Sequence, residues 1–205
     1  MRLGIFGGSF DPVHYGHLLL AECAREQLAL DQVWLVPAAV SPFKIGRQPA
    51  PAKDRLEMLE LGLAGSEHLR VSPLELDRGG ISYTVDTLAE IARQQPAAKL
   101  FLLMGADSLR DFPNWREPAR ICELATPSVV RRGGAADPDF GGLAAIVSGQ
   151  RLEEIRSSQV QMPLIELSST DLRTRAAAGH SLRYRTPRAV EKYIETHRLY
   201  QAARD

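Results

Sequence analysis

The feature that most constrains the fold of this chain is a regular alternation between short apolar runs and segments with helical spacing. Runs that fit β-strands occur at 2–6, 32–36, 69–71, 100–104, 128–131 and 144–147. Side chains that mark a helix face recur every three or four residues in four other segments, as in Leu20, Ala24 and Leu28, in Leu56, Leu59 and Leu63, in Val85, Leu88, Ala89 and Ala92, and in Val190, Tyr193, Ile194 and His197. Because such a βα series buries its strands on both faces, it favours a parallel sheet with right-handed crossovers. The sequence predicts a doubly wound α/β fold, with a single domain over residues 1–205.

Composition excludes several classes of protein. The 25 basic residues balance the 25 acidic ones, so the chain has no strong positive field with which to hold a nucleic acid. The longest apolar run, at 33–40, is far shorter than the roughly 20 residues of a membrane-spanning helix, and the N-terminus lacks the apolar core of a secretory signal. Cys23 and Cys122 form no CxxC pair, which fits a reducing cytoplasm. We expect neither a nucleic-acid partner nor a membrane anchor.

The first predicted strand-to-helix turn is where chemistry is expected, since doubly wound sheets bind ligands beyond the carboxyl ends of their strands. Gly7 and Gly8 follow the first strand and, lacking Cβ atoms, let backbone N–H groups approach an anion. The glycines do not have the GxGxxG spacing of dinucleotide-binding proteins. This difference argues against a hydride-transferring enzyme.

Two histidines follow in the segment His14-Tyr15-Gly16-His17. Three residues apart, His14 and His17 face one side of a helix that starts nearby, and Gly16 leaves room between them for a bulky ligand. At the positive end of a helix, imidazole N–H groups can stabilise charge that grows on a phosphate. No third His, Cys or acidic residue has a helpful spacing, so no protein metal site is predicted.

A second element that suits phosphate is the segment LSSTDLR, residues 167–173. Ser168, Ser169 or Thr170 can cap the helix that follows, which gathers hydroxyls and N–H groups at its positive end. Arg173 follows Thr170 by three residues and so projects from the same face, where its guanidinium can reach phosphate oxygens.

These segments carry a family resemblance. GGSFDPVHYGH resembles the HxGH signature of the nucleotidyltransferase superfamily, and LSSTDLR resembles its ISSTxxR motif, with Leu167 in place of Ile. Three further stretches, SYTVDTL at 82–88, GADSLRDFPNWREPARI at 105–121 and the segment 129–134, resemble the bacterial nicotinate mononucleotide adenylyltransferases over nearly the whole chain. The resemblance implies a Rossmann-like fold and transfer of AMP from ATP to nicotinate mononucleotide. The products are nicotinate adenine dinucleotide and pyrophosphate, in NAD biosynthesis.

The resemblance also implies roles for individual residues. Catalytic roles fall to His14, His17, Lys44 and Arg173. ATP contacts fall to Gly7, Gly8, Ser9, Phe10, His17, Gly105, Asp107, Ser168, Ser169, Thr170 and Arg173. Mononucleotide contacts fall to Lys44, Thr84, Asp107, Trp115, Arg116 and Arg132. In this family the tryptophan that matches Trp115 stacks on the pyridine ring, and backbone N–H groups near Thr84 and Arg116 hold the ring carboxylate. Asp107 is expected at the ribose or adenine side.

Two positions depart from the family pattern. Phe43 precedes Lys44 where the family more often has His, and Gly133 follows Arg132 where proline is usual. We expect Mg²⁺ to enter bound through the ATP phosphates. Because a phosphate monoester is already nucleophilic, the reaction needs alignment and charge stabilisation and no general base.

Two further functions remain open at this stage. One is an adenylyltransferase that acts on another phosphate acceptor, such as phosphopantetheine, and the other is a silent nucleotide-binding regulator. The sequence also leaves open the oligomeric state and the preference for the acid over the amide mononucleotide.

Overall fold

The computed structural model describes residues 1–42, 49–132 and 137–201, with Arg132 described by its backbone alone. Six parallel strands form one sheet in the order β3-β2-β1-β4-β5-β6. Their bounds are β1 (Arg2–Gly8), β2 (Gln32–Pro37), β3 (Leu69–Val71), β4 (Lys99–Gly105), β5 (Ala125–Arg132) and β6 (Val160–Met162). This order is that of a doubly wound sheet, so the predicted fold class is confirmed.

The strand order reverses at β1, which lies between β2 and β4. Leu3 of β1 pairs with Gln32 on one side and with Leu100 on the other. Crossovers leave β1 and β4 in opposite directions from this point, so a crevice opens beyond their carboxyl ends. The fold therefore places its ligand-binding position directly after Gly8 and Gly105.

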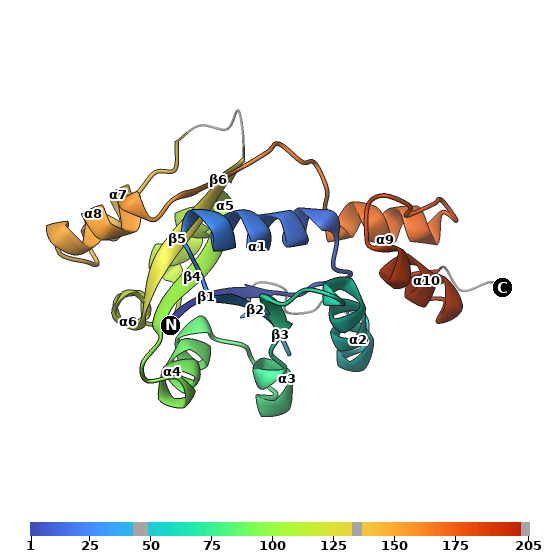
Figure 1. Cartoon of the computed structure of the whole chain (residues 1–205), viewed down its shortest axis with the longest axis horizontal. Helices are drawn as coiled ribbons and strands as arrows, with labels where there is room; N and C mark the ends of the chain where they lie inside the picture. The colour runs from blue at the N-terminus through green and yellow to red at the C-terminus, as the bar shows by residue number, and fades with distance from the viewer. Residues whose placement is uncertain (43–48, 133–136, 202–205) are drawn as a thin grey trace.

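Helices cover both faces of the sheet (Figure 1), which explains why the strands are apolar on both sides. The helical segments are α1 (Tyr15–Gln27), α2 (Ala52–Leu63), α3 (Leu74–Arg78), α4 (Thr84–Gln94), α5 (Ala106–Asp111), the 3₁₀ turn η2 (Phe112–Asn114), α6 (Pro118–Leu124), α7 (Gly141–Ala144), α8 (Gly149–Ser157), α9 (Ser169–Ala177) and α10 (Arg188–Thr196). Figure 1 shows α9 and α10 at the same end of the molecule as α2, with α7 and α8 at the other.

Alternate residues of the longer strands β1, β2, β4 and β5 enter two separate cores. Leu3 and Ile5 of β1 are buried in a cluster that includes the inner face of α4. Phe6 is buried in a second cluster with Ala21 of α1. Both faces of the strand thus contribute to burial, which fixes the register of β1 and the position of the loop that follows it.

One predicted strand is wrong and one real strand was missed. Ala144, the first residue of the predicted strand at 144–147, ends the short helix α7. Ile146 and Val147 pack against one of the cores without pairing with the sheet. The sixth strand is β6, whose three residues pair with the end of β5. A three-residue strand is too short to show a period of two, whereas an apolar run of four resembles a strand whether or not it pairs.

Two findings concern the chain as a whole. Among the described residues, no helix is both long and apolar enough to cross a membrane. Cys23 and Cys122 are free thiols, and burial raises the pKa of Cys122 to about 11.

Candidate functional site

Two adjoining cavities open at the carboxyl ends of β1 and β4. The larger has a volume of about 610 Å³ and the smaller about 210 Å³. Ser9, Ala38, Ser41 and Gly105 line both of them. Because the two cavities share a wall of residues, ligands bound in each would lie next to one another.

The two histidines line the larger cavity and stack on each other. His14 is the N-cap of α1 and is 5% exposed, and its ring centroid lies 3.7 Å from that of His17, with 21° between the planes. The backbone N–H of His14 donates to Nδ1 of His17 over 3.2 Å. Since a backbone N–H can only donate, Nδ1 carries no proton and the neutral ring carries it on Nε2. His17 is therefore an Nε2–H donor.

The ring of Phe10 packs against that of His17, and Phe10 is not among the residues that line the two cavities. Its ring is 1% exposed and meets the ring of His17 edge-on at 5.1 Å. The Phe10 side chain thus belongs to the core, and the predicted ATP contact of this residue stays a prediction for its backbone. Gly8 is needed for the same packing, since a Cβ at this position would lie 2.9 Å from the Phe10 ring.

The paired glycines lie at the end of β1, and Gly16 lines the larger cavity. Gly7 and Gly8 continue β1 to its end and border the smaller cavity, whereas the sequence suggested a turn against phosphates. A Cβ at Gly16 would lie 3.0 Å from Cε1 and Nδ1 of His14. The absence of a side chain at Gly16 thus lets the His14 ring pack closely beside it at the wall of the larger cavity.

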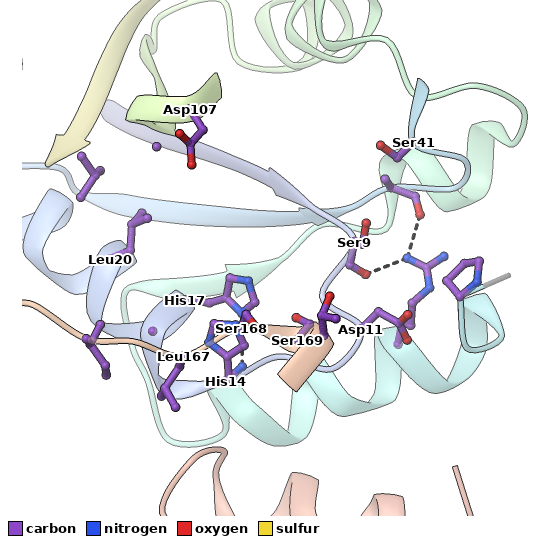
Figure 2. A pocket seen from close by; sticks show the side chains of 18 of the residues that line it. Ser9, Asp11, His14, His17, Leu20, Ser41, Asp107, Leu167, Ser168 and Ser169 are labelled. Carbon is purple, nitrogen blue, oxygen red and sulfur yellow. Dashed lines mark hydrogen bonds between the residues drawn. The ribbon is translucent and has the colours of Figure 1, made fainter. Parts of the chain in front are cut away.

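The start of α9 meets the loop after β1 directly, as Figure 2 shows. Ser169 Oγ donates to the carbonyl of Pro12 over 2.9 Å, and Arg173 Nη1 donates to the carbonyl of Asp11 over 2.8 Å. These bonds join residues 157 and 162 positions apart. The two segments to which the resemblance assigns ATP contacts thus line one cavity.

The three hydroxyls of the SST segment are already engaged within the protein. Ser168 Oγ accepts from the N–H of Asp171 and caps α9, and Thr170 Oγ1 accepts from Arg173 Nη2 over 3.2 Å. Because the N–H of Asp171 is engaged by Ser168, the backbone N–H groups of Ser169 and Thr170 are the anion donors that the first turn of α9 offers, at the positive end of the helix.

The smaller cavity combines an aromatic ring with the N-terminus of α4. Trp115, Thr84, Ser82, Thr87 and Glu75 line it. The Trp115 ring is half-buried and lies 5.3 Å from that of Phe112, which supports it. Arg116 does not line the cavity, since its exposed side chain pairs with Asp86 at 3.3 Å and covers the Tyr83 ring.

Sequence and structure comparisons identify the family. The cytidylyltransferase-like family model matches residues 5–175, a span that includes both phosphate motifs. The chain is 46% identical over 203 residues to a probable nicotinate-nucleotide adenylyltransferase of Thermus thermophilus, covering 98% of this chain and 100% of that protein. It is 44% identical to the one of Rhodopirellula baltica, covering 97% and 93%. The chain belongs to the nicotinate-nucleotide adenylyltransferase branch of the cytidylyltransferase-like family.

A solved structure supports the fold of this adenylyltransferase-family chain. The Plasmodium falciparum nicotinic acid mononucleotide adenylyltransferase, complexed with NaAD, matches with a TM-score of 0.73 at 16% identity, over 97% of both chains. At this low identity the match confirms the fold class and nothing finer.

The structure adds cations to the family site that the sequence did not indicate. Arg55 of α2 is 2% exposed and donates to the carbonyls of Ser9 (2.9 Å), Ala38 (2.8 Å) and Ala50 (3.1 Å). Burial lowers the pKa of Arg55, an effect that the Asp11 charge opposes. Within KDRLEM this arginine looks like a surface residue, and no local signal marks it. Arg131, which pairs with Asp137, also lines the larger cavity.

The remaining predicted residues divide into two groups. Gly105 and Asp107 border the larger cavity, and Figure 2 shows Asp107 at the far side from the histidines. Lys44 lies outside the described residues, as do Phe43 and Gly133, and of Arg132 the structure describes the backbone in β5. In the described parts of the chain, no three His, Cys, Asp or Glu side chains gather as metal ligands.

The smaller cavity contains a buried acid that the sequence analysis missed. Glu75 is 6% exposed, and its Oε1 accepts from Thr87 Oγ1 over 2.5 Å. Burial raises the pKa of Glu75, although hydrogen bonds from Thr87 and Ser82 and the Arg78 charge oppose this. Ser82 Oγ also accepts from the N–H of Ala39. Glu75 thus links the N-terminus of α4 to the loop after β2.

Proposed function

We propose that this chain transfers AMP from ATP to nicotinate mononucleotide, giving nicotinate adenine dinucleotide and pyrophosphate. The observation that carries the proposal is that two cavities of different chemistry share one wall. The larger cavity is lined by helix N-termini, imidazoles and arginine side chains, and the smaller cavity is lined by the ring of Trp115. The one continuous sheet that carries both also supports the proposal that the chain works as a single domain.

The larger cavity suits ATP. The N-termini of α1 and α9 both face it, and His17 Nε2–H and Arg173 add donors for the triphosphate. We propose that Asp107, across the cavity, contacts the nucleoside. ATP enters as its Mg²⁺ complex, in which the triphosphate oxygens are ligands of the ion.

The smaller cavity suits the pyridine mononucleotide. The flat apolar face of Trp115 matches a pyridine ring, and stacking contributes roughly 0.5–1.5 kcal/mol beyond burial. The backbone N–H groups at the start of α4, near Thr84, are donors for a ring carboxylate. We propose that Arg116 contributes through its backbone, because its side chain points to Asp86. The acceptor itself is supported by relatives of that name at 40–47% identity.

The reaction follows from alignment of the two ligands. A phosphate oxygen of the mononucleotide attacks the α-phosphorus of ATP, and the bond from that phosphorus to the bridging oxygen of the β-phosphate breaks. Pyrophosphate leaves with the electron pair, and no proton has to be removed from the attacking oxygen. His14, His17 and Arg173 stabilise the charge on the triphosphate in the transition state. Roles for Lys44 and Arg132 stay predictions.

The test is an acceptor panel with purified protein and Mg²⁺–ATP, read by pyrophosphate release. We expect the highest kcat/KM for nicotinate mononucleotide, compared with nicotinamide mononucleotide and phosphopantetheine. Release with phosphopantetheine alone would contradict the proposed acceptor. ATP binding without release for any acceptor would indicate a silent regulator.

A tryptophan pair tests the ring subsite. Trp115→Ala should raise KM for nicotinate mononucleotide about tenfold, from loss of stacking and of burial, and leave KM for ATP nearly unchanged. Trp34→Phe is the control, since Trp34 lies on β2 and hydrogen bonds to Gln32 outside both cavities. Equal effects of the two substitutions on KM would count against the assignment.

A further inference from the structure

The buried carboxylate of Asp11 lies beside Arg173, and both residues line the larger cavity. Asp11 is 5% exposed, and its Oδ2 lies 3.6 Å from Arg173 Nη1, which also donates to the Asp11 carbonyl. A carboxylate in a cavity that suits a triphosphate repels the phosphates, so its presence calls for a structural role. The role that fits these contacts is to orient the guanidinium of Arg173.

The second oxygen of Asp11 is held from two other parts of the chain. Tyr200 Oη donates to Oδ1 over 2.8 Å, and the backbone N–H of Ala50 donates to the same atom over 3.1 Å. Burial and the Asp11 charge raise the pKa of Tyr200, so its hydroxyl remains a donor. The carboxylate therefore has one oxygen fixed and one directed at Arg173.

Tyr200 adopts a backbone conformation that requires support. Its φ is +62°, in the left-handed region that bulky residues rarely occupy. Its ring packs against the core shared by α1, α2 and α10. A strained backbone conformation of this kind persists only when the surrounding contacts stabilise it, and the hydrogen bond from Tyr200 to Asp11 is one of those contacts.

We propose that Asp11 and Tyr200 are positioning residues that hold the Arg173 guanidinium toward the triphosphate cavity, which makes the segment after α10 part of that site. The inference rests on the proposed function in that Arg173 must contact ATP phosphates. In this relay Tyr200 fixes Asp11, and Asp11 in turn restricts the rotamers of Arg173. Neither positioning residue has to touch the substrate.

The chain offers a matched control for Tyr200. Tyr193 of α10 donates from Oη to Asp54 Oδ1, also over 2.8 Å. The two bonds have the same donor, acceptor and length and both tie the C-terminal region to the rest of the fold, but Asp54 lies on α2 and outside both cavities. Asp11 is more deeply buried than Asp54, so loss of the Tyr200 hydroxyl should cost at least as much stability as loss of the Tyr193 hydroxyl, and only the loss at Tyr200 should affect ATP.

The test compares Tyr200→Phe and Tyr193→Phe for thermal stability, kcat, the KM of each substrate and the Kd of Mg²⁺–ATP by calorimetry. We expect Tyr200→Phe to weaken ATP binding and raise KM for ATP about fivefold, with KM for the mononucleotide unchanged. Tyr193→Phe should lower stability by no more than Tyr200→Phe does and leave KM for ATP unchanged. In an Arg173→Ala background, the effect of Tyr200→Phe on ATP binding should disappear, because the relay ends at Arg173.

Three results would overturn the inference. The first is equal ATP affinity for Tyr200→Phe and wild type, and the second is an equal loss of affinity in Tyr193→Phe. The third is an undiminished effect of Tyr200→Phe in the Arg173→Ala protein. Failure of the proposed function would give another result. If the wild-type chain binds Mg²⁺–ATP but adenylates no pyridine mononucleotide, the effects of Tyr200→Phe, Arg173→Ala and the double substitution can still be compared through the Kd for Mg²⁺–ATP.

Discussion

The Nε2–H of His17 is the donor whose removal tests the triphosphate site most sharply. Asn and Gln each imitate one ring nitrogen: an Asn oxygen can accept from the His14 N–H as Nδ1 does, and a Gln amide extends to the position of Nε2. His17→Asn therefore keeps the bond at the start of α1 and removes the donor to the phosphates. His17→Gln keeps a donor and loses the rigid ring that packs on Phe10.

The expected losses follow from the value of one aligned donor. Removal of a donor to developing charge lowers kcat about 10²- to 10³-fold, or roughly 2.7–4 kcal/mol. We expect His17→Asn and His17→Ala to lose about 10²-fold or more in kcat. His17→Gln should lose about tenfold, because its donor survives without the stacked ring to hold it.

The assay is steady-state pyrophosphate release with both substrates saturating, together with thermal melts of each variant. The melts separate loss of catalysis from loss of folded protein. The reasoning would be refuted if His17→Asn turned over within about threefold of the wild type while His17→Gln did not. That result would mean that Nδ1, and not Nε2, serves the reaction.

Three other substitutions give expected outcomes of their own. Gly16→Ala should displace the His14 ring, since the new Cβ would lie 3.0 Å from it, and lower kcat about tenfold with Tm little changed; an unchanged kcat would show that the ring can move without cost. Arg55→Met leaves three part-buried backbone carbonyls without this donor and should cost about 3 kcal/mol or more in urea unfolding, whereas a loss below about 1 kcal/mol would contradict the anchoring role. Burial raises the pKa of Glu75, so the folded state binds this proton more tightly than the unfolded chain and stability is lost as pH rises through the folded-state pKa. The stability of wild type relative to Glu75→Gln should therefore fall as the pH rises above the ordinary glutamate pKa of about 4.3, and a rise in this relative stability would contradict the argument.

Several parts of the molecule were predictable because their signals are local. Strands with both faces buried leave apolar runs, and amphipathic helices leave a three-to-four residue period, so five of the six strands were placed from the sequence near their observed positions. The GGSFDPVHYGH and LSSTDLR segments also carry their chemistry within a few residues, including the cap at Ser168 and the Thr170–Arg173 contact. The strand β6 was not predicted, because three residues at the edge of the sheet are too few to show an alternation of apolar and polar side chains.

Other parts of the site depend on contacts that no local pattern records. Nothing around Arg55 or Glu75 distinguishes a buried residue from a solvated one, because burial is decided by what packs on the helix from elsewhere. The sequence pointed to Phe10 as an ATP contact and to Gly16 as a source of space for the ligand, and the fold also uses both residues to place the two imidazoles. A residue in a motif can serve the motif's geometry without touching its substrate.

The alternation of strands and helices along the chain and the two segments that can hold phosphate are legible in the sequence. The bonds of Ser169 to Pro12 across 157 positions and of Tyr200 to Asp11 across 189 are visible only in the folded chain. The physical reason is range: backbone periodicity and helix caps involve neighbours within about four residues, whereas the orientation of a guanidinium or a carboxylate depends on atoms that only folding brings within 3 Å.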